Sequence, residues 1–132
     1  MIAFRKLSAD QSGAAVVEIA LSLPVLLTFI YGMFQVGMVM AADAGMQHAL
    51  GEGARLATIY PTPNDTTIKS KISSKVFGTY IGTYVVSDPV SFAAGTSKYK
   101  DLQVRYTVTP NFLLFNGPPI TLTRTKRVYL SF

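Results

Sequence analysis

The sequence predicts an α+β protein: a long N-terminal transmembrane helix, a second short helix and a small three-stranded antiparallel sheet. Three observations lead to this fold class. Residues 19–42 contain no Asp, Glu, Lys, Arg or His; small and apolar residues continue at helical spacing as far as Tyr60; and from Tyr84 onward apolar residues recur at every second position. With 132 residues in total, the chain has room for one small domain beside the helix.

The uncharged run is long enough to cross a membrane. Its 24 residues span ~36 Å as a helix, against the ~30 Å hydrocarbon core of a bilayer. We expect one helix from about Ala14 to Ile59, kinked at Pro24, because proline removes a helical hydrogen bond. Tyr60-Pro61 ends it, since the residue before a proline avoids the helical region.

The remaining elements follow from the change in period. Ile68 to about Thr79 is predicted as a second helix, capped by Thr66 or Thr67. Strands are predicted around residues 84–92, over 102–109 and over 120–130, with a hairpin turn at Gly95-Thr96-Ser97. The aromatic residues are expected to fill the core of this domain, with a binding surface as the alternative: Phe77, Tyr80, Tyr84, Phe92, Tyr99 and Tyr106.

Composition argues against several functions. The chain has no cysteine and one histidine, His48, so most metal sites are excluded. No nucleotide-binding, metalloprotease or nucleophile-elbow motif occurs. We therefore expect no metal, no cofactor and no enzyme activity. The net charge of +5 comes from scattered Lys and Arg residues, and we do not expect nucleic-acid binding.

The start of the apolar run carries the most specific signal. Glu18 is the only charged residue between Asp10 and Asp43, and a carboxylate so close to the hydrocarbon indicates a function. Its natural partner is a cation. If the chain were cut between Gly13 and Ala14, the new α-amino group would lie one helical turn from Glu18, on the same subunit or on a neighbour.

This segment resembles a known family of proteins. Gly13, four small or apolar residues, Glu18 and a long apolar helix resemble a prepilin-peptidase site of the type IV pilin class. The stretch Asp10-Gln11-Ser12-Gly13-Ala14-Ala15-Val16-Val17-Glu18-Ile19-Ala20-Leu21-Ser22-Leu23-Pro24 is similar to the N-terminus of TadE-like proteins. These are pseudopilins, or minor pilins, of the tight-adherence (Tad, or Flp) pilus system. Gly51-Glu52-Gly53-Ala54-Arg55 matches a small-residue segment that the family carries after the membrane.

The resemblance implies a division of the chain and a set of partners. Residues 1–13 would be a leader removed by a prepilin peptidase, 14–42 a transmembrane helix, 43–60 its extracytoplasmic extension and 61–132 a small α+β domain. The implied partners are membrane lipid, other pilins or pseudopilins and the pilus assembly machinery. The implied location is the bacterial inner membrane, with a cytoplasmic N-terminus and incorporation into a pilus.

Three alternatives stay open. The chain could be an uncleaved membrane-anchored envelope module that binds a partner protein, since Arg5 and Lys6 before the run already orient a signal anchor. It could also be a pseudopilin of DNA uptake. Lastly, Val39-Met40-Ala41-Ala42 is similar to a signal-peptide cleavage site, although the apolar run exceeds the usual length of ~7–15 residues.

A row of small residues repeats at every fourth position from residue 37. Small residues at this spacing form a groove in which another helix backbone can approach closely. We expect this small-residue stripe to pack against another helix. Its members are Gly37, Ala41, Gly45, Ala49, Gly53 and Ala57.

Overall fold

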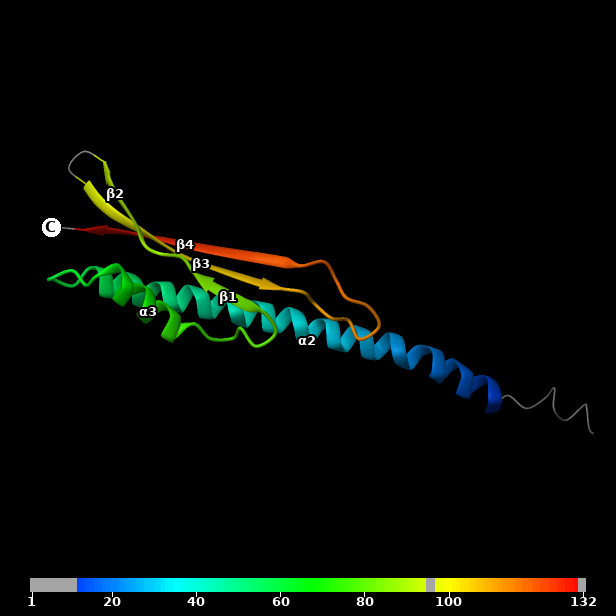
Figure 1. Cartoon of the computed structure of the whole chain (residues 1–132). Coiled ribbons are helices and arrows are strands. Elements are labelled where there is room, and N and C mark those ends of the chain that lie inside the picture. The colour runs from blue at the N-terminus through cyan, green and yellow to red at the C-terminus, as the bar shows by residue number, and fades with distance from the viewer. Residues whose placement is uncertain (1–11, 95–96, 131–132) are drawn as a thin grey trace, which may run out of the picture.

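The computed structural model describes residues 12–94 and 97–130. Its elements are α2 (Ser12–Ala57), α3 (Asp65–Lys75), β1 (Thr83–Val86), β2 (Val90–Ala94), β3 (Ser97–Val108) and β4 (Ile120–Leu130). The molecule is elongated: α2 runs along most of it, and α3 and the sheet cover only its C-terminal half (Figure 1). The predicted α+β class, with its long first helix and short second helix, is confirmed.

The first helix is one continuous element of 46 residues, within two residues of its predicted ends. The second helix begins and ends earlier than predicted. Asn64, and not Thr66 or Thr67, is its N-cap, because the Asn64 side chain accepts a hydrogen bond from the Thr67 amide at 2.8 Å. The helix stops at Lys75, and Gly78 then takes a positive φ of 76° where the chain turns against α2.

The sheet has four strands, not three. β3 is the central strand: β4 pairs along it from Lys98 to Val108, while β1 and β2 pair with its two ends. Because β4 occupies one edge throughout, β1 and β2 lie end to end on the other. The strand predicted around residues 84–92 is therefore two short strands, since Pro89 has no N–H to donate and interrupts the ladder. Gly95 and Thr96 of the predicted hairpin turn lie outside the described residues.

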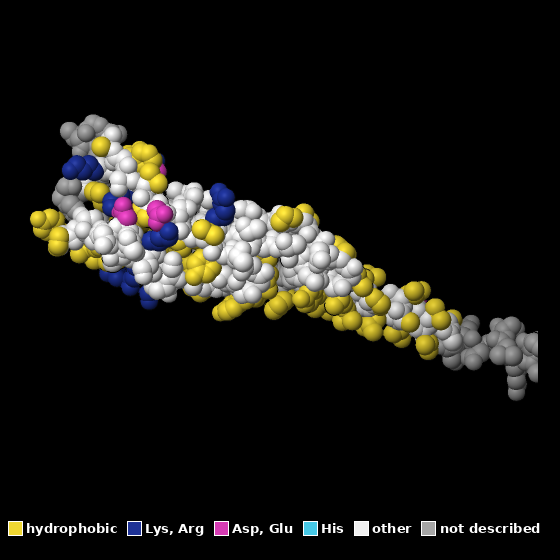
Figure 2. All heavy atoms as spheres, in the orientation of Figure 1, with side chains coloured by type: hydrophobic (Ala, Val, Ile, Leu, Met, Phe, Trp, Pro, Cys, Tyr) yellow, Lys and Arg dark blue, Asp and Glu magenta, His cyan; other side chains and the backbone are white. Residues whose placement is uncertain are grey.

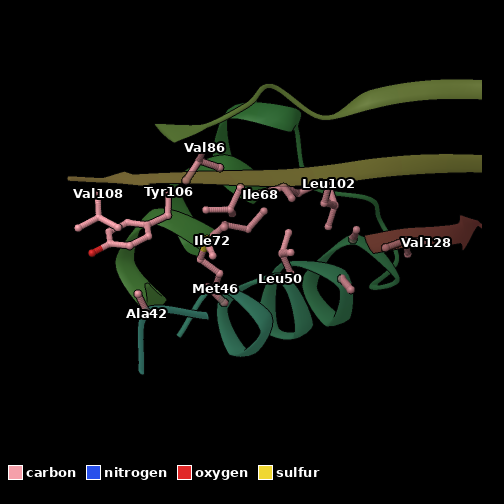
Figure 3. Close-up of a cluster of buried hydrophobic side chains, with 14 residues drawn as sticks. Ala42, Met46, Leu50, Ile68, Ile72, Val86, Leu102, Tyr106, Val108 and Val128 are labelled. Carbon is pink, nitrogen blue, oxygen red and sulfur yellow. The ribbon is translucent and has the colours of Figure 1, made fainter. Parts of the chain in front are cut away.

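The core lies between the C-terminal half of α2, α3 and one face of β3 (Figure 3). As the period of two predicted, alternate β3 residues are buried: Leu102, Val104, Tyr106 and Val108. Small residues dominate the helix side, where Ala42, Ala49 and Ala57 are fully buried. We call the C-terminal half of α2 (residues 42–57), α3 and the sheet the packed domain.

The predicted aromatic core is wrong for most of its members. Phe77, Tyr80, Tyr84 and Phe92 are between 38% and 82% exposed, and only Tyr106 is fully buried. The reason is the close approach of the elements. A sheet and a helix that meet over Ala and Gly leave room for Ile, Leu and Val but for few rings.

Candidate membrane anchor and assembly site

The N-terminal half of α2, up to residue 41, is mostly apolar, and most of its side chains are exposed. We call it the free half. Among residues 16–36 the large apolar side chains are between 41% and 71% exposed, and they lie around the whole circumference of the helix. Among the described residues, one helix is long and apolar enough to cross a membrane, Gly13–Ala57. Hydrophobic side chains cover this free half, whereas the Lys and Arg side chains visible in the same view lie over the packed domain (Figure 2). A helix that is apolar all round requires lipid or protein around it.

The predicted cleavage site lies at the beginning of α2. Gly13 is the second residue of the helix, and a side chain at that position would meet nothing within 4 Å. Ala14 and Glu18 follow as exposed residues one turn apart. Within the part of the chain that the structure describes, the Glu18 side chain makes no hydrogen bond or ion pair. The acidic group is therefore available to a cation that the described chain does not supply.

Pro24 lies inside α2 without ending the helix. The hydroxyl of Thr28 donates a hydrogen bond to the Pro24 carbonyl at 2.8 Å, one turn further on. Ser22 donates similarly to Ile19 at 3.2 Å. These bonds keep side-chain hydroxyls satisfied along an apolar helix. The kink at Pro24 stays a prediction.

The small-residue stripe divides into two parts. Ala49 and Ala57 are fully buried, a Cβ at Gly45 would overlap the backbone carbonyl of Phe77, and a Cβ at Gly53 would overlap Ile72 of α3. These four residues pack within the chain itself. Gly37, by contrast, has nothing within 4 Å of the position of a Cβ. Ala41 lies between the two parts, with its backbone 2.6 Å from the position of a Cβ on Gly78.

An ion pair joins the end of the uncharged run to the sheet. Arg124 of β4 donates from Nε and an Nη atom to both carboxylate oxygens of Asp43, at 2.6 and 3.0 Å. The Arg124 hydrogen bond holds the pKa of Asp43 below its usual value, and Asp43 raises the pKa of Arg124. Since Asp43 is the first charged residue after Glu18, this pair marks where the charged surface begins.

A second contact, which the sequence did not predict, lies inside the uncharged run. Gln35 is only 6% exposed, and its Oε1 accepts a hydrogen bond from the Asn111 amide at 2.9 Å. The ring of Phe112 packs against Gly32. The connection between β3 and β4 therefore reaches past the packed domain and lies along the free half of α2 (Figure 1). A possible sequence signal was the run Phe112-Leu113-Leu114-Phe115, which is unusually apolar for a loop.

One buried polar group has no partner. The Tyr106 hydroxyl has no hydrogen bond among the described residues, and burial raises the pKa of this phenol. In Figure 3 the hydroxyl points away from Ile68 and Leu102.

These features define a class of protein: a small α+β domain built onto the end of a single long helix whose free half is suited to a membrane. The comparison with known families is more specific. Residues 13–55 match the model of the family described as TadE-like protein, so the N-terminal segment of the chain is TadE-like and the resemblance found in the sequence is confirmed. The matched residues all lie in α2. No curated protein and no solved structure is significantly similar to the chain.

Proposed function

We propose that the chain is a minor pilin, or pseudopilin, with a structural role in the assembly of a Tad-type pilus. The observation that carries the proposal is that the family match falls on α2. The TadE-like match covers residues 13–55, and it includes the whole of the apolar helix segment that has few partners in its own chain. A pilin needs such a helix twice, first in lipid and then among the helices of neighbouring subunits.

The proposed orientation places the N-terminus in the cytoplasm and the packed domain outside. Arg5 and Lys6 precede the apolar run, and basic residues at a membrane boundary favour the cytoplasmic side. The chain has no cysteine, so single cysteines can report topology directly. A cysteine at the exposed Thr125 should react with an impermeant thiol reagent in intact cells, and a cysteine at Ser8 should not. The reverse labelling would contradict this orientation.

The proposed processing is cleavage between Gly13 and Ala14 by a prepilin peptidase. In support, both residues are exposed at the first turn of α2, and the family match begins at Gly13. Glu18 would then neutralise the new α-amino group in the assembled state. Gly37 would face the helix of a neighbouring subunit, because it is free of contacts, whereas Gly45, Ala49, Gly53 and Ala57 pack within the chain.

Intact-mass analysis of the protein purified from its host membrane tests the processing. The expected mass lacks residues 1–13 when the peptidase is active and retains them when it is absent. Gly13→Val should block the cleavage. Gly37→Val is the matched control, because Gly37 is equally free of contacts, and it should be cleaved normally. A mass that retains residues 1–13 beside an active peptidase would favour the uncleaved envelope module instead.

A further inference from the structure

The connection between β3 and β4 lies at the level of the apolar helix and not of the packed domain. Its residues Asn111 and Phe112 contact Gln35 and Gly32 of α2. Gly32 precedes Asp43, the first charged residue, by eleven positions, or ~16 Å along a helix. This distance is about half the ~30 Å hydrocarbon thickness of a bilayer.

In α2 and in the hairpin formed by β3 and β4, the charged residues end at the same level along the molecule. Residues 19–42 of α2 are uncharged, and so are residues 106–123, which include the whole connection and the adjoining strand ends. The charged residues that bound the hairpin segment are Arg105 and Arg124, and Arg124 is paired with Asp43. The boundary between charged and uncharged residues therefore lies at one level in α2, β3 and β4.

The tip of the connection exposes large apolar side chains. Leu113, Leu114 and Phe115 are 59%, 66% and 60% exposed, and Leu113 takes a φ of 65°, which is uncommon for a residue other than glycine. Between the tip and α2 lies an open groove of about 620 Å³. Its lining is almost wholly apolar and includes Phe29, Met33, Phe112 and Leu114. In water this surface would carry a substantial hydrophobic cost.

Five backbone amides of the connection donate hydrogen bonds within the protein. The amides of Phe112, Leu114 and Gly117 donate to carbonyl groups within the connection at 2.6–2.8 Å. The amide of Asn111 donates to Gln35, and that of Leu113 to the Asn111 side chain, both at 2.9 Å. Positions 110, 118 and 119 are prolines and have no N–H. Irregular backbone survives in hydrocarbon only when its polar groups find partners within the protein, and this connection meets that demand at these positions.

We propose that residues 111–115 insert into the lipid acyl chains of the leaflet that also surrounds residues 32–42 of α2. The inserted tip holds the packed domain at a fixed height and rotation against the membrane surface. Lipid is the occupant that the charge boundary favours, because that boundary is level across helix and hairpin, as a bilayer surface is. The inference rests on the proposed membrane anchoring, but not on the role in a pilus.

Tryptophan quenching by brominated lipid tests the insertion, since the chain has no tryptophan. The full chain is reconstituted at high lipid dilution in phosphatidylcholine vesicles whose acyl chains carry bromine. Leu114→Trp reports the tip, with Phe115→Trp as a second variant should the first fold poorly. Phe34→Trp on the free half of α2 is the positive control, and Tyr129→Trp at the far end of β4 is the negative control. All four positions are exposed in the structure.

The expected result is a loss of fluorescence for Leu114→Trp comparable to that for Phe34→Trp, while Tyr129→Trp keeps its signal. If Phe34→Trp is quenched and Leu114→Trp is not, the tip lies outside the lipid or is covered by a second protein chain, and the proposal is overturned. If Phe34→Trp itself escapes quenching, the membrane anchoring fails and the insertion fails with it.

Discussion

The two halves of α2 are one continuous helix, but they differ in what surrounds them. The N-terminal half carries large apolar side chains that are mostly exposed, such as Leu21 at 71%. The C-terminal half carries many small residues, and several of these are fully buried against α3 and the sheet. The comparison teaches that the more hydrophobic half is not the half that forms the core. Small residues let the sheet approach, whereas bulky residues that point in all directions are left for lipid or for other subunits.

The largest expected effect separates the halves through a matched pair of leucines. Leu102→Ala removes a fully buried side chain that faces α2 and α3, and such a change costs about 2–5 kcal/mol through lost burial and the cavity left behind. Leu26→Ala removes a side chain that is 54% exposed on the free half, and it should leave unfolding of the packed domain unchanged. Urea unfolding of the purified chain in detergent, followed by circular dichroism, measures both. Equal losses would mean that the halves unfold as one unit.

A smaller loss is expected for Gly45→Ala. A Cβ at this position would overlap the Phe77 carbonyl of the segment after α3, and an overpacked contact against backbone costs about 1–3 kcal/mol. Gly37→Ala is the matched control, because its Cβ would meet nothing within 4 Å. The same urea titration should show a lower midpoint for Gly45→Ala alone. A midpoint equal to that of the unchanged protein would contradict the close packing of α2 on this segment.

Part of this fold could be predicted from the sequence. The apolar helix, its end shortly before Tyr60-Pro61 and the strand over 120–130 were predictable, because each rests on local composition or period. The element that packs against each face of α2 was not predictable. The stripe of small residues predicted a helix contact, but the spacing could not tell α3 of the same chain from a helix of another subunit.

The errors have the same origin. Pro89 was present in the sequence, but its effect depends on the edge of β3 that its strand occupies. Asn111 and Gln35 are 76 residues apart, so no local pattern could join them. The site at Gly13, Ala14 and Glu18 came from a motif, and the described chain supplies no partner against which its geometry could be judged.

A pH-dependent loss of stability is expected from the ion pairs of the packed domain. Hydrogen bonds from Arg124 and Arg127 lower the pKa values of Asp43 and Asp101 in the folded state. Because the folded pKa lies below the unfolded value of ~3.9, the contribution is fully present above that pH. It is lost as the pH falls through the folded pKa. Urea midpoints measured between pH 7 and about pH 2 should fall below pH ~4, and they should fall less steeply in Asp43→Asn.

A nearly neutral result is expected for Tyr106→Phe. The buried hydroxyl has no hydrogen-bond partner among the described residues, so its removal takes away a desolvated polar group and leaves the ring in place. The free energy of unfolding should stay the same or rise by up to ~1 kcal/mol. A clear loss of stability would show that the hydroxyl makes a hydrogen bond, for example to a water molecule buried in the core.

The smallest effect on the packed domain, and the most selective one, is expected for Glu18→Gln. Glu18 lies at the far end of the free half, exposed and without a partner in the described chain. The change should leave the urea midpoint, membrane insertion and cleavage after Gly13 as they are, because water at the membrane boundary solvates the carboxylate and the new α-amino group separately. In the assembled state that water is excluded, and an unpaired charge becomes costly.

The defect should therefore appear only as a loss of co-purification with other pilus components. Glu18→Asp should lie between Glu18→Gln and the unchanged protein, because its carboxylate is kept but is shorter by one methylene group. Leu102→Ala gives the opposite pattern and serves as the control, since its primary defect is in folding. If Glu18→Gln is cleaved and incorporated like the unchanged protein, the charge at the start of α2 has no role in assembly, and the free half of the helix acts through its apolar surface alone.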